Sequence, residues 1–102
     1  MIKDQIIDGI LKTLENKLNL TELEKDILDS IKDLKKLPVD RNALIKRIKE
    51  NKAKYDDMML KTFALLTIQS RELPVYKLYD EFSNEELQNY LITQIKILFT
   101  KS

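Results

Sequence analysis

Cysteine and histidine are both absent from this chain of 102 residues. Without cysteine, disulfide bridges, thiol nucleophiles and cysteine-ligated metal sites are excluded. Without histidine, the chain lacks the commonest general base and the commonest zinc ligand. Paired acids such as Glu85 and Glu86 would point about 100° apart on a helix, so they do not converge on one substrate atom. We therefore expect no enzymatic activity, no metal and no cofactor.

Turn-forming residues are also scarce, with one glycine and two prolines in the whole chain. A fold built from many β-hairpins needs more tight turns than these can provide. No apolar run approaches the roughly 18 residues that span a bilayer, and acids interrupt the apolar pattern at the start, unlike a secretory signal. We expect a single helical domain over residues 1–102, located in the cytoplasm.

What is present is apolar spacing of helical period, beginning with two segments in the first third of the chain. The first segment covers about residues 2–18, and the second runs from about Glu22 to Lys36. Thr21 lies just before the second segment and Glu24 lies in its first turn, which is the pattern of a capping box. The predicted inner stripe of the first segment consists of Ile2, Ile6, Ile10, Leu14 and Leu18, and it is widened by Ile7 and Leu11.

Two further long helices are predicted in the rest of the chain. The third runs from Arg41 to about Ser70 behind Asp40 as N-cap, and the last follows a second capping box at Ser83 and Glu86. A short connecting helix is expected over Pro74–Phe82. Because the first loops are short, the predicted fold is an all-α, antiparallel four-helix bundle with one short additional connecting helix.

Several positions break the regular pattern. Gly9 lies inside the first helix, where it either allows a close helix contact or is a tolerated weakness, with a hinge as the alternative. The apolar stripe of the third helix skips a turn at Asn51-Lys52, which predicts a bend or a frayed packing contact there. The segment "MMLKTFALLTI" is apolar on more than one face and is expected to be deeply buried. The extra apolar residues of the last helix predict either broad burial or an exposed docking patch.

The basic residues gather in one block. Residues 35–54 carry eight basic and two acidic side chains, a balance of +6. The stretch "KRIKENKAKYDD" lies mostly within it, and its position after a proline turn superficially suggests a helix-turn-helix nucleic-acid binder. Projected on a helix, however, its cations flank the stripe of Ile48, Tyr55 and Met59 on both sides, which is typical of a solvated helix face. Nucleic acid is therefore not the favoured partner.

One combination of segments resembles a known family. The segments are "LTELEKDIL" (residues 20–28), "IKDLKKLP" (residues 31–38) and "ALIKRI" (residues 43–48), behind an amphipathic helix. This order is similar to that of the small immunity proteins with which lactic acid bacteria and streptococci protect themselves from their own bacteriocin. The likeness covers residues 1–50, and the C-terminal half departs from the family pattern.

The resemblance implies an antiparallel four-helix bundle that binds a bacteriocin–receptor complex at the cytoplasmic side of the membrane, with peripheral membrane contact. The candidate partner-contact residues lie in the C-terminal region, on its expected exposed side: Tyr76, Lys77, Tyr90 and Lys96. The alternative is a helical adaptor or regulatory protein with a cytosolic protein partner. Both functions depend on a surface that recognises another protein.

Overall fold

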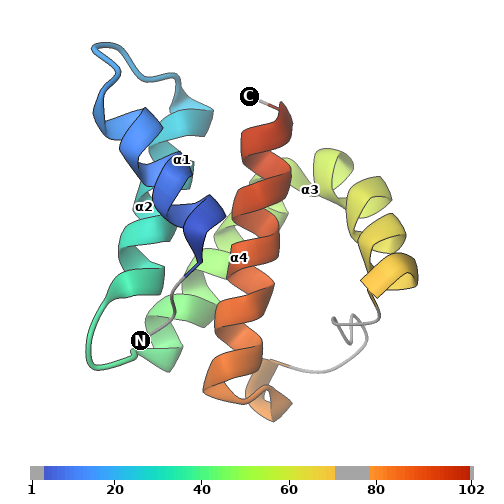
Figure 1. Cartoon of the computed structure of the whole chain (residues 1–102). Helices are drawn as coiled ribbons and strands as arrows, with labels where there is room; N and C mark the ends of the chain where they lie inside the picture. Colours follow the sequence, from blue (N-terminus) through green and yellow to red (C-terminus); the bar gives the residue numbers. More distant parts are fainter. Residues whose placement is uncertain (1–3, 71–78, 102) are drawn as a thin grey trace.

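The computed structural model describes the backbone of residues 4–70 and 79–101 and the side chains of residues 4–58 and 80–100. This described part is all-helical and contains no strand, which confirms the all-α prediction. Within it, four α-helices follow one another (Figure 1): α1 (Gln5–Glu15), α2 (Glu22–Lys35), α3 (Arg41–Ser70) and α4 (Asn84–Lys101). A single 3-10 turn, η1 (Tyr79–Glu81), comes just before α4.

The first two helices begin where side chains satisfy their free backbone N–H groups. The Asp4 carboxylate accepts hydrogen bonds from the N–H groups of Ile6 and Ile7, at 2.9 and 3.2 Å. At α2, the Thr21 hydroxyl accepts from the Glu24 N–H at 3.2 Å, and the Glu24 carboxylate accepts from the Thr21 N–H at 3.0 Å. The predicted capping box at the start of α2 is confirmed.

Helices α3 and α4 are capped in the same way. The Asp40 carboxylate accepts from the Ala43 N–H at 3.1 Å, as expected for the N-cap of α3. At α4, Ser83 and Glu86 exchange two hydrogen bonds of 3.0 and 3.1 Å between side chain and backbone, so the second predicted capping box is also confirmed. These contacts fix where each helix starts, and therefore which side chains face inward.

The short connecting helix expected over Pro74–Phe82 is not seen. Residues 71–78 lie outside the described part. Of the expected helix, only residues 79–82 are described, and they contain only the 3-10 turn η1. Phe82 follows this turn and is buried against Tyr90, with ring centroids 5.8 Å apart in an edge-to-face arrangement. This pair joins the end of the connection to the first turns of α4.

The centre of the hydrophobic core is α4, which contacts each of the other three helices. Figure 1 shows it standing between the α1–α2 pair and the far half of α3, and α1 and α2 run in opposite directions. The hydrophobic core includes Ile7, Ile10 and Leu14 of α1, Ile27 and Ile31 of α2, and Leu44 and Ile48 of α3. Leu87, Leu91, Ile95 and Leu98 of α4 are completely buried.

The additional apolar residues of α4 are buried as well. Ile92 and Ile97 are both almost inaccessible to solvent, and Phe99 is half-buried against the core. A helix that is apolar around most of its circumference is normally enclosed by other elements. Of the two alternatives for this helix, broad burial is therefore correct for these residues.

Helix α1 is shorter than expected, and its inner face is placed differently. It ends at Glu15, and Ile7, Ile10 and Leu14 form its buried stripe. The predicted stripe was wrong at Ile6, which is 59% exposed, and at Leu18, which is 99% exposed in the turn after the helix. The physical reason is that a straight helix face takes residues spaced alternately three and four apart, as Ile7, Ile10 and Leu14 are, and a strictly four-apart series drifts off that face.

Gly9 does not allow a close helix contact among the described residues. It is exposed, and a Cβ atom built on it would have no neighbouring atom within 4 Å. The interpretation as a close-contact glycine is therefore wrong. A glycine on the outer face of a helix weakens that helix without a packing gain in the described structure.

Helix α3 has the predicted bounds, but it bends at a different residue. The backbone leaves the helical conformation at Tyr55, with φ −124° and ψ 29°, and not at Asn51-Lys52 as expected. Asn51 instead occupies a buried position in the regular helix. Most of the segment "MMLKTFALLTI" lies outside the described side chains, and its Met58 is half-buried against the core.

Among the described residues, none of the helices has the length and apolar content that crossing a bilayer requires.

Candidate functional site: the polar seam between α2, α3 and α4

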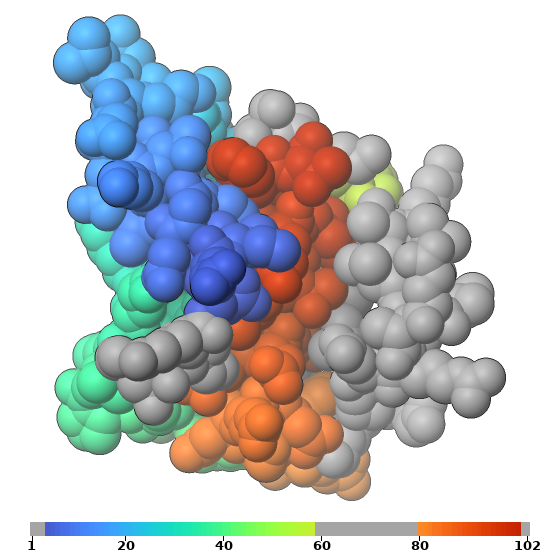
Figure 2. Space-filling model, viewed as in Figure 1, coloured from blue at the N-terminus to red at the C-terminus, as the bar shows by residue number. Residues whose placement is uncertain are grey.

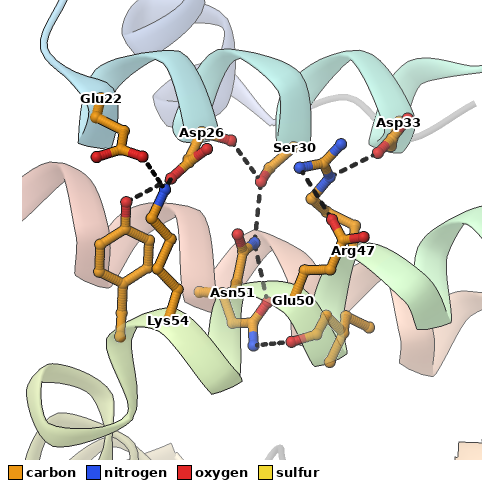
Figure 3. A network of polar contacts seen from close by, with 11 residues as sticks. Glu22, Asp26, Ser30, Asp33, Arg47, Glu50, Asn51 and Lys54 are labelled. Carbon is orange, nitrogen blue, oxygen red and sulfur yellow. Dashed lines mark hydrogen bonds and ion pairs between the residues drawn. The ribbon is translucent and has the colours of Figure 1, made fainter.

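Polar side chains from three helices meet along the contact between α2 and α3 and extend into the core at α4 (Figure 3). We call this set the polar seam: Glu22, Asp26, Ser30 and Asp33 of α2, Arg47, Glu50, Asn51, Lys54 and Tyr55 of α3, and Gln94 of α4. The α2 members are spaced three or four residues apart, so helical geometry places them on one face.

The middle of the seam is buried and uncharged. Asn51 is 2% exposed, and its Nδ2 lies 3.0 Å from Ser30 Oγ and 3.4 Å from Gln94 Oε1. Gln94 Nε2 in turn donates to the Ile48 carbonyl at 3.1 Å, and Ser30 Oγ donates to the Asp26 carbonyl at 2.7 Å. One connected network of hydrogen bonds therefore links α2, α3 and α4 inside an otherwise apolar core.

A buried amide costs free energy unless its hydrogen bonds are made. Sliding α3 along α2 or α4 would separate Asn51 from Ser30 or Gln94, so the network favours one register of the three helices. Buried polar residues act in this way in coiled coils, where one asparagine selects the register. The network is not visible in the sequence, where Asn51 is only a gap in the apolar stripe of α3.

One end of the seam is charged and partly open to solvent. Lys54 Nζ lies 2.7 Å from Glu22 Oε1 and 2.8 Å from Asp26 Oδ2. The Tyr55 hydroxyl also donates to Asp26 Oδ2, and the Lys54 ammonium lies 5.6 Å from the centre of the Tyr55 ring. Two carboxylates of α2 thus hold adjacent side chains of α3 at the point where that helix bends.

These contacts shift the pKa values of the groups involved. Burial alone would raise the pKa of Asp26, but hydrogen bonds from Lys54 and Tyr55 outweigh it and lower the pKa. Burial, together with the hydrogen bond to the Asp26 carboxylate, raises the pKa of Tyr55 to about 12. The hydrogen bonds to Asp26 and Glu22 raise the pKa of Lys54. All three groups are therefore held in the protonation states that bind one another.

At the other end of the seam, Arg47 binds two carboxylates. Its Nε donates to Asp33 Oδ2 at 2.8 Å, and Nη1 lies 3.5 Å from Glu50 Oε2. Burial opposes the charged guanidinium, but the hydrogen bond and attraction from Asp33 outweigh this effect and raise the pKa of Arg47. Arg47 is only 22% exposed, so this pair is better shielded from solvent than a typical surface ion pair.

Several cations of the basic block, residues 35–54, pair with acidic side chains of the same chain. Arg47 and Lys54 face the acids of α2, while Lys35 lies 2.6 Å from Asp8 of α1. Much of the positive charge of residues 35–54 is thus matched within the protein. The exposed lysines at positions 46, 49 and 52 lie on the outer side of α3, as the solvated-face interpretation predicts.

The predicted contact residues do not come together as one surface. Tyr76 and Lys77 lie outside the described residues. The expectation that Tyr90 is exposed was wrong, because it is 6% exposed and packs against Phe82 in the core. Lys96 is half-buried, and its Nζ lies 3.2 Å from Asp4 Oδ2. Burial would raise the pKa of Asp4, but hydrogen bonds from Ile7 and Lys96 outweigh it and lower the pKa.

The seam offers hydrogen bonding and charge pairing, and no group of three or more metal-ligating side chains converges among the described residues. Next to it, Lys49, Lys52, Ala53 and Asp56 line a shallow hollow that is open to solvent. The described arrangement can therefore position helices and present a surface for recognition.

No protein-family model, curated protein or solved structure matches this chain.

Proposed function

We propose that this chain is a bacteriocin immunity protein of the cytoplasm, built as an antiparallel four-helix bundle. It protects the producing cell by binding a bacteriocin–receptor complex at the cytoplasmic side of the membrane. The partner is a protein, and contact with the membrane is peripheral. The binding surface lies on the outside of the helices, because the described interior is occupied by the core and the polar seam.

The observation that carries this proposal is the local structure of the segments that resemble the family. The Leu-Thr-x-x-Glu pattern at residues 20–24 forms a complete capping box at the start of α2. The segment of residues 31–38 ends α2 and turns the chain, and residues 43–48 lie in the first turns of α3. The order of helix, cap, helix, short linker and helix therefore supports the resemblance over residues 4–50.

Three large apolar side chains offer contact points for a protein partner. Ile6 on α1 is 59% exposed, Leu37 after α2 is 62% exposed, and Leu18 in the turn between α1 and α2 is 99% exposed. Burying such a side chain at an interface contributes roughly 1.5–3 kcal/mol if it becomes fully enclosed. All three belong to the α1–α2 hairpin or its ends, which makes this hairpin the part of the surface to test first.

The test is to express the chain in bacteria that are sensitive to class IIa bacteriocins and to measure growth against a broad panel of these peptides. The proposal expects a raised inhibitory concentration for at least one of them. A variant with Ile6→Ser, Leu18→Ser and Leu37→Ser is expected to lose protection, since its apolar contacts are removed. A matched control with Gln5→Ser, Asn19→Ser and Asn42→Ser, which changes exposed polar positions in the same regions, is expected to retain it.

Absence of protection against every peptide, with the protein folded and expressed, would contradict the immunity function. The second candidate is the helical adaptor, which the same exposed apolar side chains favour. Purification from the native host separates the two, because a membrane receptor and a cytosolic protein are different partners. The triple serine variant and its polar control serve in that experiment as well.

A further inference from the structure

Helix α3 is interrupted at Tyr55 without the residues that usually bend a helix. Sharp kinks normally occur at proline, at glycine or serine pairs, or at π-bulges. The stretch around the break reads "KAKYDDM" and contains neither proline, glycine nor serine. The backbone nevertheless leaves the helical conformation at Tyr55, and helix resumes afterwards as far as Ser70. Figure 1 shows the resulting change of direction where α3 passes beyond α4.

The charges around the break are arranged as at the junction of two separate helices. Lys52 and Lys54 lie in the last turn before Tyr55, and the exposed Asp56 and Asp57 lie in the first turn after it. Cations stabilise the C-terminal end of a helix and anions its N-terminal end, through the helix dipole. Each half of α3 therefore has the charge that favours an end at Tyr55.

The first half of α3 is tied to its neighbours by the polar seam. Arg47 binds Asp33, Asn51 binds Ser30, and Lys54 binds Asp26. At the break itself, the Tyr55 hydroxyl donates a hydrogen bond to the Asp26 carboxylate of α2. Figure 3 shows the adjacent Lys54 reaching toward Glu22 and Asp26 of α2. The Tyr55–Asp26 contact thus lies at the break itself.

We propose that Tyr55 is a latched hinge of α3, in which its hydrogen bond to Asp26 sets the direction of residues 56–70 relative to the rest of the protein. Because the charges favour a helix end on each side of Tyr55, the break in the helical backbone is stabilised, and the Tyr55–Asp26 contact can select the angle between the two halves. The phenol serves as donor over a wide pH range, because it keeps its proton up to alkaline pH. The hinge is independent of the immunity function, since it concerns the angle within α3 and not the identity of a partner.

The absence of cysteine makes the hinge accessible to distance measurements between two introduced, spin-labelled cysteines. One pair, Lys32→Cys with Gln69→Cys, spans the hinge, and the control pair, Lys32→Cys with Lys46→Cys, stays on its near side. Gln69 lies about 20 Å beyond Tyr55 along the helix axis, so a change in direction of about 15° moves it by about 5 Å. In the Tyr55→Phe variant we expect a shift or broadening of about that size for the first pair and no change for the control pair.

Two further variants complete the test. Asp26→Ala removes the acceptor and should reproduce the effect of Tyr55→Phe on the distance to residue 69. Lys54→Met keeps the tyrosine–aspartate hydrogen bond and should leave that distance unchanged. The proposal is overturned if Tyr55→Phe and Asp26→Ala both leave the distance across the hinge unaltered. It is also overturned if the control pair shifts equally, or if Lys54→Met has the same effect as Tyr55→Phe.

Discussion

The side-chain amide of Asn51 on α3 donates a hydrogen bond to the hydroxyl of Ser30 on α2 across 3.0 Å, with both side chains buried. The same amide faces Gln94 on α4, so three helices share one polar contact point in the core. An apolar side chain at position 51 would remove the donor to Ser30 Oγ and Gln94 Oε1, and Ser30 and Gln94 would keep only their bonds to the Asp26 and Ile48 carbonyls. The stability of this core therefore depends on a matched set of polar groups.

The Asn51→Leu variant is expected to lose about 1–3 kcal/mol of unfolding free energy, because Gln94 then keeps a buried oxygen without its donor. Urea unfolding followed by far-UV circular dichroism measures this as a lower midpoint at an unchanged slope. The combined variant Ser30→Ala, Asn51→Leu, Gln94→Met removes the whole network and should lose less than the single variant. A combined loss equal to the sum of three single losses would show that the network is not a unit.

The Gly9→Ala variant is expected to stabilise the protein by about 0.5–1 kcal/mol. Gly9 is exposed in the middle of α1, and a Cβ atom there meets no described neighbour within 4 Å, so alanine gains helix propensity without a clash. Thermal unfolding should show a rise of about 4 °C. The matched control is Ala53→Gly at an exposed position of α3, which should change the midpoint in the opposite direction. A lower midpoint for Gly9→Ala would contradict the placement of Gly9 on an open, outward-facing side of α1.

The Thr21→Ala variant is expected to lose about 1 kcal/mol, since the Glu24 N–H loses its acceptor at the start of α2. Thr21→Ser preserves the hydroxyl and serves as the control, with a stability close to that of the original protein. Both values come from the same chemical unfolding measurement. If alanine and serine behave alike, the capping box contributes nothing to stability.

Stability is expected to be flat between about pH 5.5 and pH 9, because no histidine or cysteine is present to titrate there. Asp4 and Asp26 have a pKa below the ordinary carboxyl value, so their contribution is present above about pH 4 and is lost as the pH falls through the folded value. The pKa of Tyr55, which is raised to about 12, makes stability fall at high pH instead of at low pH. Its contribution is present below about pH 10 and is lost as the pH rises through 12.

Urea midpoints measured across this range test the expectation. The Tyr55→Phe variant should lose part of the alkaline decline while keeping the acid one, because it removes the titrating phenol and leaves the carboxylates. A marked change of stability near neutral pH in the original protein would contradict the assignment of these groups.

Local sequence signals predicted much of the helical structure. Thr21 and Glu24, and again Ser83 and Glu86, mark helix starts that the structure confirms, because a capping box involves only residues close in the chain. The inner face of α1 was predicted less well. Ile6 and Ile7 are adjacent and both apolar, and only the position of the neighbouring helices decides which of them is buried.

The polar seam could be predicted only in part. The sequence has an acidic excess in residues 1–34 and a basic excess in residues 35–54. These opposite charges could have indicated that the two segments pair with each other. Asn51 could not be recognised as a core residue, since its partners Ser30 and Gln94 come together only in the folded chain. The bend at Tyr55 likewise depends on a contact with Asp26, which is distant in sequence.

The position of α4 at the centre of the core has a consequence for biosynthesis. It is the last of the four helices to be made, yet the apolar faces of α1, α2 and α3 all pack against it. Until residues 84–101 have left the ribosome, the three earlier helices have no common partner, and their apolar side chains stay open to chaperones and to other chains. The described core can therefore be completed only after residues 84–101 have been synthesised.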